Sequence, residues 1–580
     1  MRKFMLAVSL VALTATGGCK KVAGDSSAAA PAEVKSDGSE WSDYMEKFLN
    51  GYFPINPSFA IYQGRHELDG QLTDFSPEGL QAAIDYRKQA VADARAIDES
   101  TLSDAQKFER EYLVNTMQGE LFWLEEADQP HKNPAFYVGA LDPSVFIARP
   151  YADAETRMKA FTKYLQNMPA AAEQIKANLK LPLPATFVKY GKAGFGGFAE
   201  FYMGDAKVAF EAVKDETLQT ELNQAAAAAS AAMKDLAGYV GSQPGTPGGF
   251  ELGAAKFANM VKKTEGVDIS LAELEAIGRT DLKRNQDALA KVCATYAAGA
   301  TMQACMDKMS ANKADDGPVA EARRQLPPLK AFLIEKDLVS IPGTEEAQVE
   351  ESPPYNRQNS AYIDIPGPFE KGLPSVYYIS PPDPSWDQKT QDEFVAGKAD
   401  LLGTSVHEIW PGHFLNFLHA NRADSLFGRL FVGYAFAEGW AHYGEEMIFE
   451  AGFNELDGMG RAELRVGQIS NALLRDCRFI SAIALHSQGM TVEQSKQLFM
   501  DECYQAEGTA IQQSARGTYD PAYLNYTMGK LMIKKLREDW TKGDKTKWKE
   551  FHDEFLSYGG PNIPMVRQSM MKEDSAKAVF

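Results

Sequence analysis

The chain has 580 residues, of which 44% are hydrophobic, and its formal net charge is −19 at pH 7. This apolar content suffices for a large folded core, while the acidic balance argues against nucleic acid or anionic lipid as partners, because like charges repel. We therefore expect a folded acidic protein that does not bind nucleic acid.

The N-terminus has the pattern of a secretion signal. Two basic residues precede the apolar run Phe4–Leu13, and small residues follow it up to Cys19. The run is shorter than the roughly 20 residues that a membrane-spanning helix needs. Residues 1–18 are therefore interpreted as a signal peptide. The segment before Cys19 resembles a bacterial lipobox, with Thr16 where leucine is commonest, so we expect Cys19 to be lipidated; an ordinary cleaved signal is the alternative.

Residues 19–40 are predicted to be a lipidated flexible tether, because they are small, polar and without periodicity. Residues 41–580 are predicted to form a single helical catalytic domain. The lipid would be the only attachment to the membrane, since no later stretch is long and apolar enough to span it. Lys20, in place of aspartate after Cys19, favours a periplasmic protein on the outer membrane.

The fold class is predicted to be mainly α. Apolar residues recur every three to four positions in four segments: Trp41–Phe53, Glu78–Ile97, Ala105–Glu126 and Leu218–Tyr239. Three capping boxes mark helix starts, at Ser103 with Gln106, Ser270 with Glu273 and Thr491 with Gln494. The glycine- and proline-rich residues 241–249 form the clearest loop and a possible subdomain boundary.

Strand-like character occurs between residues 360 and 380, where aromatic and β-branched residues alternate with turn residues. We expect a short hairpin there. This segment shortly precedes the histidine-rich region in the sequence, so the sheet could lie beside a metal-binding helix. There it would offer an extended substrate an edge to pair with.

Four cysteines remain if Cys19 carries lipid: Cys293, Cys305, Cys477 and Cys503. An even number permits disulfides in an oxidising periplasm, and Cys293 with Cys305 is the pair closer in sequence. Three pairings are open, and four buried thiols are an equal alternative.

Histidines gather in one region: His407, His413, His419, His442 and His486 are five of the eight in the chain. The sharpest motif there is HEIWPGH, residues 407–413. In the usual HExxH helix, two histidines four residues apart bind zinc and the glutamate activates water. A spacing of six would turn the two imidazoles apart on an ideal helix. We therefore predict that Pro411 and Gly412 interrupt the helix and return His413 to the metal.

The third ligand is expected on a following helix. Glu438 lies 25 residues beyond His413, in the segment EGWAHYGEE, and we assign it to the metal. His442 lies one turn further on the same face, so it is an alternative partner for Glu438. Otherwise, we expect His442 and Glu445 to hydrogen-bond to a metal-binding side chain and fix its orientation without binding the metal themselves. His419 is interpreted as a packing residue.

These motifs together resemble the bacterial "domain of unknown function 885" family, which is grouped with the gluzincin metallopeptidases. The resemblance rests on HExxPGH, the downstream EGWxxYxE, Arg475-Asp476 with His486, and the segment PAYLNYTMGK at residues 521–530. It covers about Trp41 to Val566. It implies a mostly helical gluzincin-like fold, a single zinc ion, and His407, His413 and Glu438 as its ligands, with Glu408 catalytic.

The expected reaction is hydrolysis by water that zinc activates, with Glu408 moving the proton. Three candidates could stabilise the oxyanion or support the site: Tyr526, His486 and Tyr443. Three basic residues could bind a substrate carboxylate, which would make the enzyme a carboxypeptidase or dipeptidase: Arg475, Arg516 and Lys530. Each of the six has a structural alternative, as a core residue or an ion pair.

The function predicted from these residues is that of a zinc metallopeptidase acting on short periplasmic peptides. One alternative is a zinc amidohydrolase acting on a non-peptide or cell-wall amide. Another is a lipoprotein that binds a metal or peptide without catalysis, which the presence of Glu408 disfavours.

Overall fold

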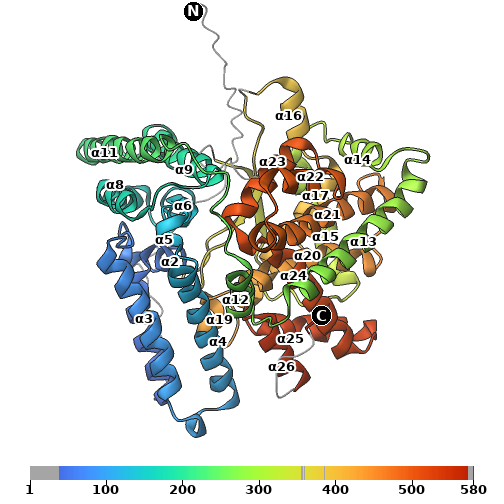
Figure 1. Cartoon of the computed structure of the whole chain (residues 1–580), viewed down its shortest axis with the longest axis horizontal. Coiled ribbons are helices and arrows are strands. Elements are labelled where there is room, and N and C mark those ends of the chain that lie inside the picture. The colour runs from blue at the N-terminus through green and yellow to red at the C-terminus, as the bar shows by residue number, and fades with distance from the viewer. Residues whose placement is uncertain (1–37, 354–356, 358–359, 385, 573–578) are drawn as a thin grey trace, which may run out of the picture. The chain divides into compact units, whose positions relative to one another are not determined.

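Helices make up most of the chain (Figure 1). The computed structural model describes residues 38–353, 357, 360–384, 386–572 and 579–580. The predicted signal peptide, Cys19 and almost all of the predicted tether lie outside these ranges. The described residues form one compact unit.

The N-terminal half consists of eleven α-helices among the described residues. Their bounds are α1 Glu40–Ile55, α2 Pro57–Tyr62, α3 Pro77–Ala96, α4 Asp104–Leu121, α5 Gln129–Lys132, α6 Pro134–Ala140, α7 Ser144–Ala148, α8 Ala154–Asn178, α9 Ala185–Met203, α10 Asp205–Val208 and α11 Glu216–Gly241. The four segments with helical periodicity correspond to α1, α3, α4 and α11. Beyond α4 the chain continues through the π-turn Phe122–Glu126.

The C-terminal half carries the remaining helices. Their bounds are α12 Ala254–Glu265, α13 Leu271–Tyr296, α14 Met302–Ser310, α15 Pro318–Glu335, α16 Gln388–Phe394, α17 Lys398–Glu408, α18 His413–Ala420, α19 Leu426–Leu430, α20 Tyr434–Glu450, α21 Arg461–Ser487, α22 Val492–Asp501, α23 Glu507–Tyr519, α24 Asn525–Thr541, α25 Trp548–Ser557 and α26 Ile563–Met571. All three predicted capping boxes are confirmed, at the starts of α4, α13 and α22.

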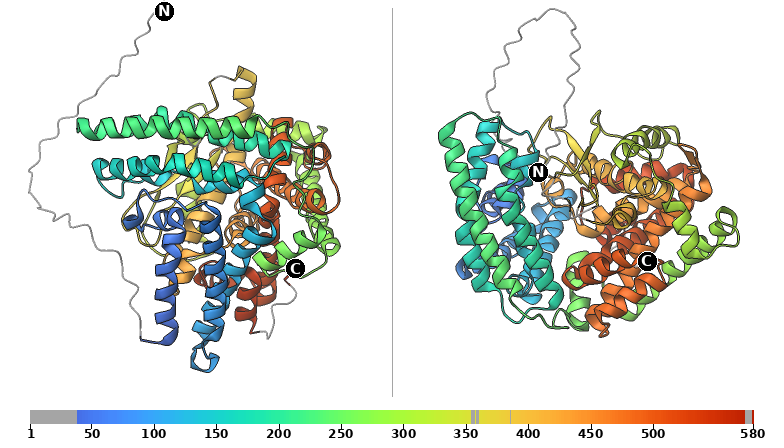
Figure 2. Two further views of the ribbon diagram at one scale, coloured as in Figure 1. Left: turned by 60° about the vertical axis from the view of Figure 1, so that its left-hand side comes forward. Right: turned by 90° about the horizontal axis from the view of Figure 1, so that it is seen from above.

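Two hydrophobic cores hold these helices together. One is built mainly from α6 to α11, with Phe250 and Leu485 at its margin. The other draws on residues between Phe122 and Val579, mainly in α12 to α15, α17, α18 and α20 to α26. Figure 2 shows the teal and green helices α8, α9 and α11 side by side, apart from the orange and red helices of the second core. The predicted loop 241–249 connects α11, in the first core, to the segment that enters the second.

A three-stranded sheet accompanies the helices of the second core. Its strands are β1 Ala347–Glu351, β2 Ala361–Asp364 and β3 Ser375–Ile379, in the order β1-β3-β2. The antiparallel pairing of β2 with β3 confirms the predicted hairpin. The parallel strand β1 was not predicted, because only Val349 of its five residues is buried. A separate two-stranded ladder joins β4 Glu455–Leu456 to β5 Met459–Gly460.

The four cysteines form two disulfides, the candidate pair Cys293–Cys305 and the pair Cys477–Cys503. The first was favoured by its short separation, and the alternative of four free buried thiols is wrong. Among the described helices, none combines the length and the apolar character that crossing a bilayer requires.

Candidate metal centre

The helix that carries the HExxPGH motif is broken within the motif. α17 ends at Glu408 and α18 begins at His413, so the predicted interruption is confirmed as a complete break. The Gly412 N–H donates to the carbonyl oxygen of Val406 at 2.9 Å. A Cβ atom on Gly412 would overlap the carbonyl oxygen of His407, so only glycine allows the chain to fold back this closely.

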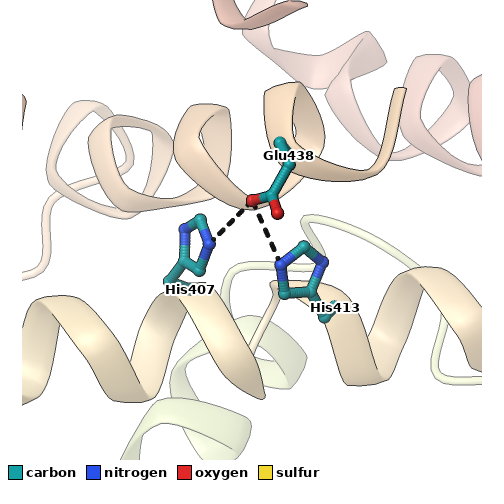
Figure 3. Close-up of side chains that lie close together, drawn as sticks. All are labelled: His407, His413 and Glu438. Carbon is teal, nitrogen blue, oxygen red and sulfur yellow. Dashed lines mark hydrogen bonds and ion pairs between the residues drawn. The ribbon is translucent and has the colours of Figure 1, made fainter. Parts of the chain in front are cut away.

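This turn places His413 beside His407, where both imidazoles face Glu438 of α20 (Figure 3). One carboxylate oxygen of Glu438, Oε2, lies 3.1 Å from His407 Nε2 and 3.3 Å from His413 Nε2. One ligand atom from each of the three residues falls within 4.8 Å of the others. Two imidazole nitrogens and a carboxylate oxygen are a donor set that suits zinc and leave a coordination position open.

Glu445, about two helical turns beyond Glu438 on α20, contacts the His407 ring on the side away from Glu438. Its Oε1 is 2.8 Å from His407 Nδ1, which leaves Nε2 directed toward Glu438. The same carboxylate contacts His442 Nδ1 at 3.2 Å and the Arg475 guanidinium at 3.2 Å. A carboxylate on the distal nitrogen of a ligating histidine is the usual means of fixing its tautomer. The geometry therefore suits the predicted orienting role of Glu445. His442 contacts Glu445 and not His407.

The electrostatics of the cluster favour charged carboxylates. Burial would raise the pKa of Glu438, but His413 and His407 hold it well below its usual value. Burial likewise opposes ionisation of Glu445, and Arg475 and His442 keep its pKa low. Burial and Arg475 lower the pKa of His407, yet its hydrogen bonds to Glu438 and Glu445 outweigh them and raise it to about 9. The two carboxylates are therefore charged, and a metal ion that binds His407 Nε2 would displace a proton from it.

A close crossing of two helices sets the position of Glu438. Gly439 on α20 faces Gly529 on α24, and a Cβ on either would press on the backbone of the other helix. Two glycines allow the helix backbones to approach this closely. The crossing brings Tyr526, at the start of α24, toward the face of α20 that carries Glu438.

A cavity of about 1320 Å³ opens onto the cluster. Its wall includes His407, His413, Glu438 and Glu408, together with β2 residues and side chains from α6 and α9. Glu408 is only 8% exposed, yet it faces this space. The small sheet therefore lies beside α17, the helix that carries His407, as predicted.

Tyr526 and several arginines line the cavity next to the cluster. The Tyr526 ring lies 6.1 Å from the His407 ring, centre to centre, at an angle of 20°. Burial and Glu438 raise the pKa of Tyr526, so its hydroxyl remains protonated. Arg516 contacts its hydroxyl at 3.5 Å and pairs with Asp520 at 2.9 Å. Arg475 also lines the cavity, although its guanidinium is held by Glu445.

Three predicted site residues lie elsewhere. His486 is 1% exposed and fully engaged, because its Nε2 donates to the Gly517 carbonyl at 2.7 Å and its Nδ1 accepts from the Leu252 N–H. Lys530 is buried in an ion pair with Asp281, and the Tyr443 hydroxyl binds His552 and Arg537. None of the three lines the cavity. The structure therefore places these three residues outside the cavity wall, with other partners than those predicted for catalysis, substrate binding or support of the ligands.

Sequence reasoning missed Arg478 and its neighbour Gln513. Both line the cavity, and Arg478 Nε donates to Gln513 Oε1 at 2.8 Å. The available signal was the spacing of three residues between Arg475 and Arg478, which places both on one side of a helix. His419 bonds to the carbonyl of Ser340, in keeping with the predicted packing role.

Comparison with known proteins places the chain in its family. A candidate lipoprotein of unknown function from Shewanella oneidensis has a similar structure, with a TM-score of 0.74, 21% identity, and coverage of 92% of this chain and 100% of that one. A candidate lipoprotein from Colwellia psychrerythraea gives a TM-score of 0.74 at 16% identity, covering 92% of this chain and 99% of that one. These likenesses show a shared fold.

A carboxypeptidase from Pyrococcus furiosus aligns over 92% of this chain and 96% of its own at 10% identity, with a TM-score of 0.37 that is too low to carry an argument. A search of the curated proteins finds no match. The family model described as "Bacterial protein of unknown function (DUF885)" matches residues 57–570, nearly the whole of the folded part. The chain therefore belongs to the DUF885 family.

Proposed function

We propose that this protein is a zinc-dependent metallopeptidase that hydrolyses short peptides. The observation that carries the proposal is the meeting of His407, His413 and Glu438 in a large cavity that Glu408 also lines. A set of two histidines and a glutamate with a neighbouring glutamate is the arrangement of gluzincin-type peptidases. The proposal includes one zinc ion per chain.

The three proposed ligands would hold the ion, and Glu445 would keep His407 in the tautomer that presents Nε2. A bound zinc ion would polarise the scissile carbonyl and lower the pKa of water. Glu408 would accept the proton of the attacking water and pass it to the leaving amine. Tyr526, kept protonated by burial and by Glu438, would donate a hydrogen bond to the developing oxyanion.

Peptides are favoured as substrates by the edge of the sheet. β2 is one of the two edge strands in the order β1-β3-β2, and its residues Ala361, Tyr362 and Ile363 line the cavity. An extended peptide could pair with this edge while a bond between two of its residues lies at the metal. The volume of about 1320 Å³ suits a chain of a few residues more than a folded protein.

The proposed location is the periplasm, with lipid on Cys19 as the sole anchor and the outer membrane as its site of attachment. Cys19 lies outside the described residues. The likeness to two candidate lipoproteins and the charge pattern before the cysteine support this proposal.

The test is a comparison of metal content and turnover in chains that begin after Cys19. We expect about one zinc per wild-type chain and cleavage of at least one member of a mixed peptide library. Glu408→Gln should retain zinc and lose turnover, because it removes the proton carrier and leaves all three ligands in place. Full turnover in this variant would exclude Glu408 from the mechanism, and absence of zinc from the wild type would exclude the metal site.

A further inference from the structure

Arg478 is a buried cation on the cavity wall without an acidic partner. Its guanidinium lies 4.8 Å from the centre of the Tyr526 ring, and the residue is 7% exposed. Arg475 pairs with Glu445 and Arg516 with Asp520, whereas no carboxylate in the described part of the chain pairs with Arg478. Its one side-chain hydrogen bond there is the neutral contact from Nε to Gln513.

The two terminal nitrogens of Arg478 form no hydrogen bond with the described residues, and neither is fully buried. The residue lines the cavity wall, so the cavity is the space open to them. The planar end of the guanidinium can donate two parallel hydrogen bonds, and it is therefore accessible to a ligand in the cavity. The amide of Gln513 on α23 fixes Nε and with it the plane of the group.

The local charge favours an anion at this point. Burial, Arg516 and Arg475 lower the pKa of Arg478 to about 10, which still leaves it charged at neutral pH. A buried charge that neighbouring cations destabilise gains the most when a carboxylate arrives.

The position of Arg478 relative to the metal cluster limits which carboxylate it can reach. Arg478 and His407 both lie against the Tyr526 ring, the guanidinium 4.8 Å and the imidazole 6.1 Å from its centre, so the two groups are at most about 11 Å apart. Successive Cα atoms of a peptide are about 3.8 Å apart. The terminal carboxylate of a peptide whose last or next-to-last bond lies at the cluster therefore falls near Arg478.

We propose that Arg478, with Arg516 beside it, binds the C-terminal carboxylate of the substrate, so that the enzyme acts as a carboxypeptidase. This inference rests on the proposed peptidase function and specifies its substrate class as peptides with a free C-terminus. Arg478 acts in binding, and Glu408 and the metal ligands remain responsible for the chemistry.

Cleavage is tested with a mixed pool of N-acetylated tripeptides, prepared once as free acids and once as C-terminal amides. We expect the zinc-loaded wild type to release C-terminal residues from the acids, with kcat/KM at least about tenfold higher than for the amides. Arg478→Gln should abolish this preference by raising KM for the acids alone, and Arg478→Lys should restore part of it. Arg465→Gln is the matched control, because Arg465 is on the same helix α21, contacts Gln468 and Phe449, and does not line the cavity.

Binding is measured separately in the Glu408→Gln background, by calorimetry with N-acetyl-Ala-Ala-Phe and its amide. The acid should bind at least about tenfold more tightly than the amide, and the difference should vanish when Arg478→Gln is added. Preferential binding of the acid without cleavage of any peptide would overturn the peptidase proposal and support the carboxylate site. Equal behaviour of the acid and amide forms in both measurements overturns the assignment of Arg478.

Discussion

Replacing Glu445 by glutamine would test whether the carboxylate behind His407 tunes the metal site. Glu445→Gln keeps the size of the side chain and removes the charge that lies 2.8 Å from His407 Nδ1. Loss of a carboxylate partner of a ligating histidine typically weakens metal binding by about 10- to 100-fold. We therefore expect the dissociation constant for zinc to rise by that factor, which corresponds to about 1.4–2.7 kcal/mol.

The same change should also destabilise the fold. Arg475, whose side chain is 9% exposed, would lose its carboxylate partner, and an unpaired buried charge costs about 3 kcal/mol or more. Zinc affinity is measured by competition with a chromophoric chelator, and stability by denaturant unfolding of the metal-free protein.

Glu446→Gln provides a matched control on the next residue. Glu446 is 6% exposed and binds Arg284 at 2.6 Å and Lys534 at 2.6 Å, with no contact to the proposed ligands. This variant should lose stability and keep its zinc affinity. Equal zinc affinity of Glu445→Gln and wild type, or an equal loss in both variants, would refute the orienting role.

Three further predictions concern the structure around the site. Gly412→Ala should abolish zinc binding while leaving most helices folded, because a Cβ there overlaps the His407 carbonyl; wild-type zinc content would contradict this. His486 has a pKa of about 4 against an ordinary 6.5, chiefly through burial, so the folded state binds fewer protons than the unfolded chain. Stability should therefore fall by about 3 kcal/mol between pH 6.5 and 4, and His486→Gln should flatten that slope in denaturant titrations. Removing the Cys477–Cys503 bridge by a double serine substitution should cost about 3 kcal/mol of unfolding free energy, since it closes a loop of 26 residues; an unchanged denaturation midpoint would contradict this.

Local interactions account for the parts of the fold that the sequence predicted well. A capping box such as Ser270 with Glu273 involves residues three apart, so its geometry follows from the helix start itself. The break at Pro411 and Gly412 is equally local, because a spacing of six residues cannot place two histidines on one helical face. The hairpin of β2 and β3 was visible because alternating residues mark each strand.

Contacts between distant helices decided what the sequence left open. The role of Glu445 depends on the packing of α20 against α17, and the partner of Lys530 is Asp281, far away in the chain. β1 escaped prediction because its pairing with β3 buries a single side chain.

Helix α21 shows the distinction most clearly. His486 lies eight residues beyond Arg478, about 12 Å further along the helix and on a similar side, since eight residues make slightly more than two turns. The sequence singled out His486 and not Arg478, because histidine is the chemically more prominent of the two. Only the tertiary structure decided that the cavity reaches Arg478, while His486 is covered by Phe257 and the Gly517 carbonyl. The physical reason is that a helix repeats its faces along its whole length, whereas the depth of a cavity is set by the helices packed around it.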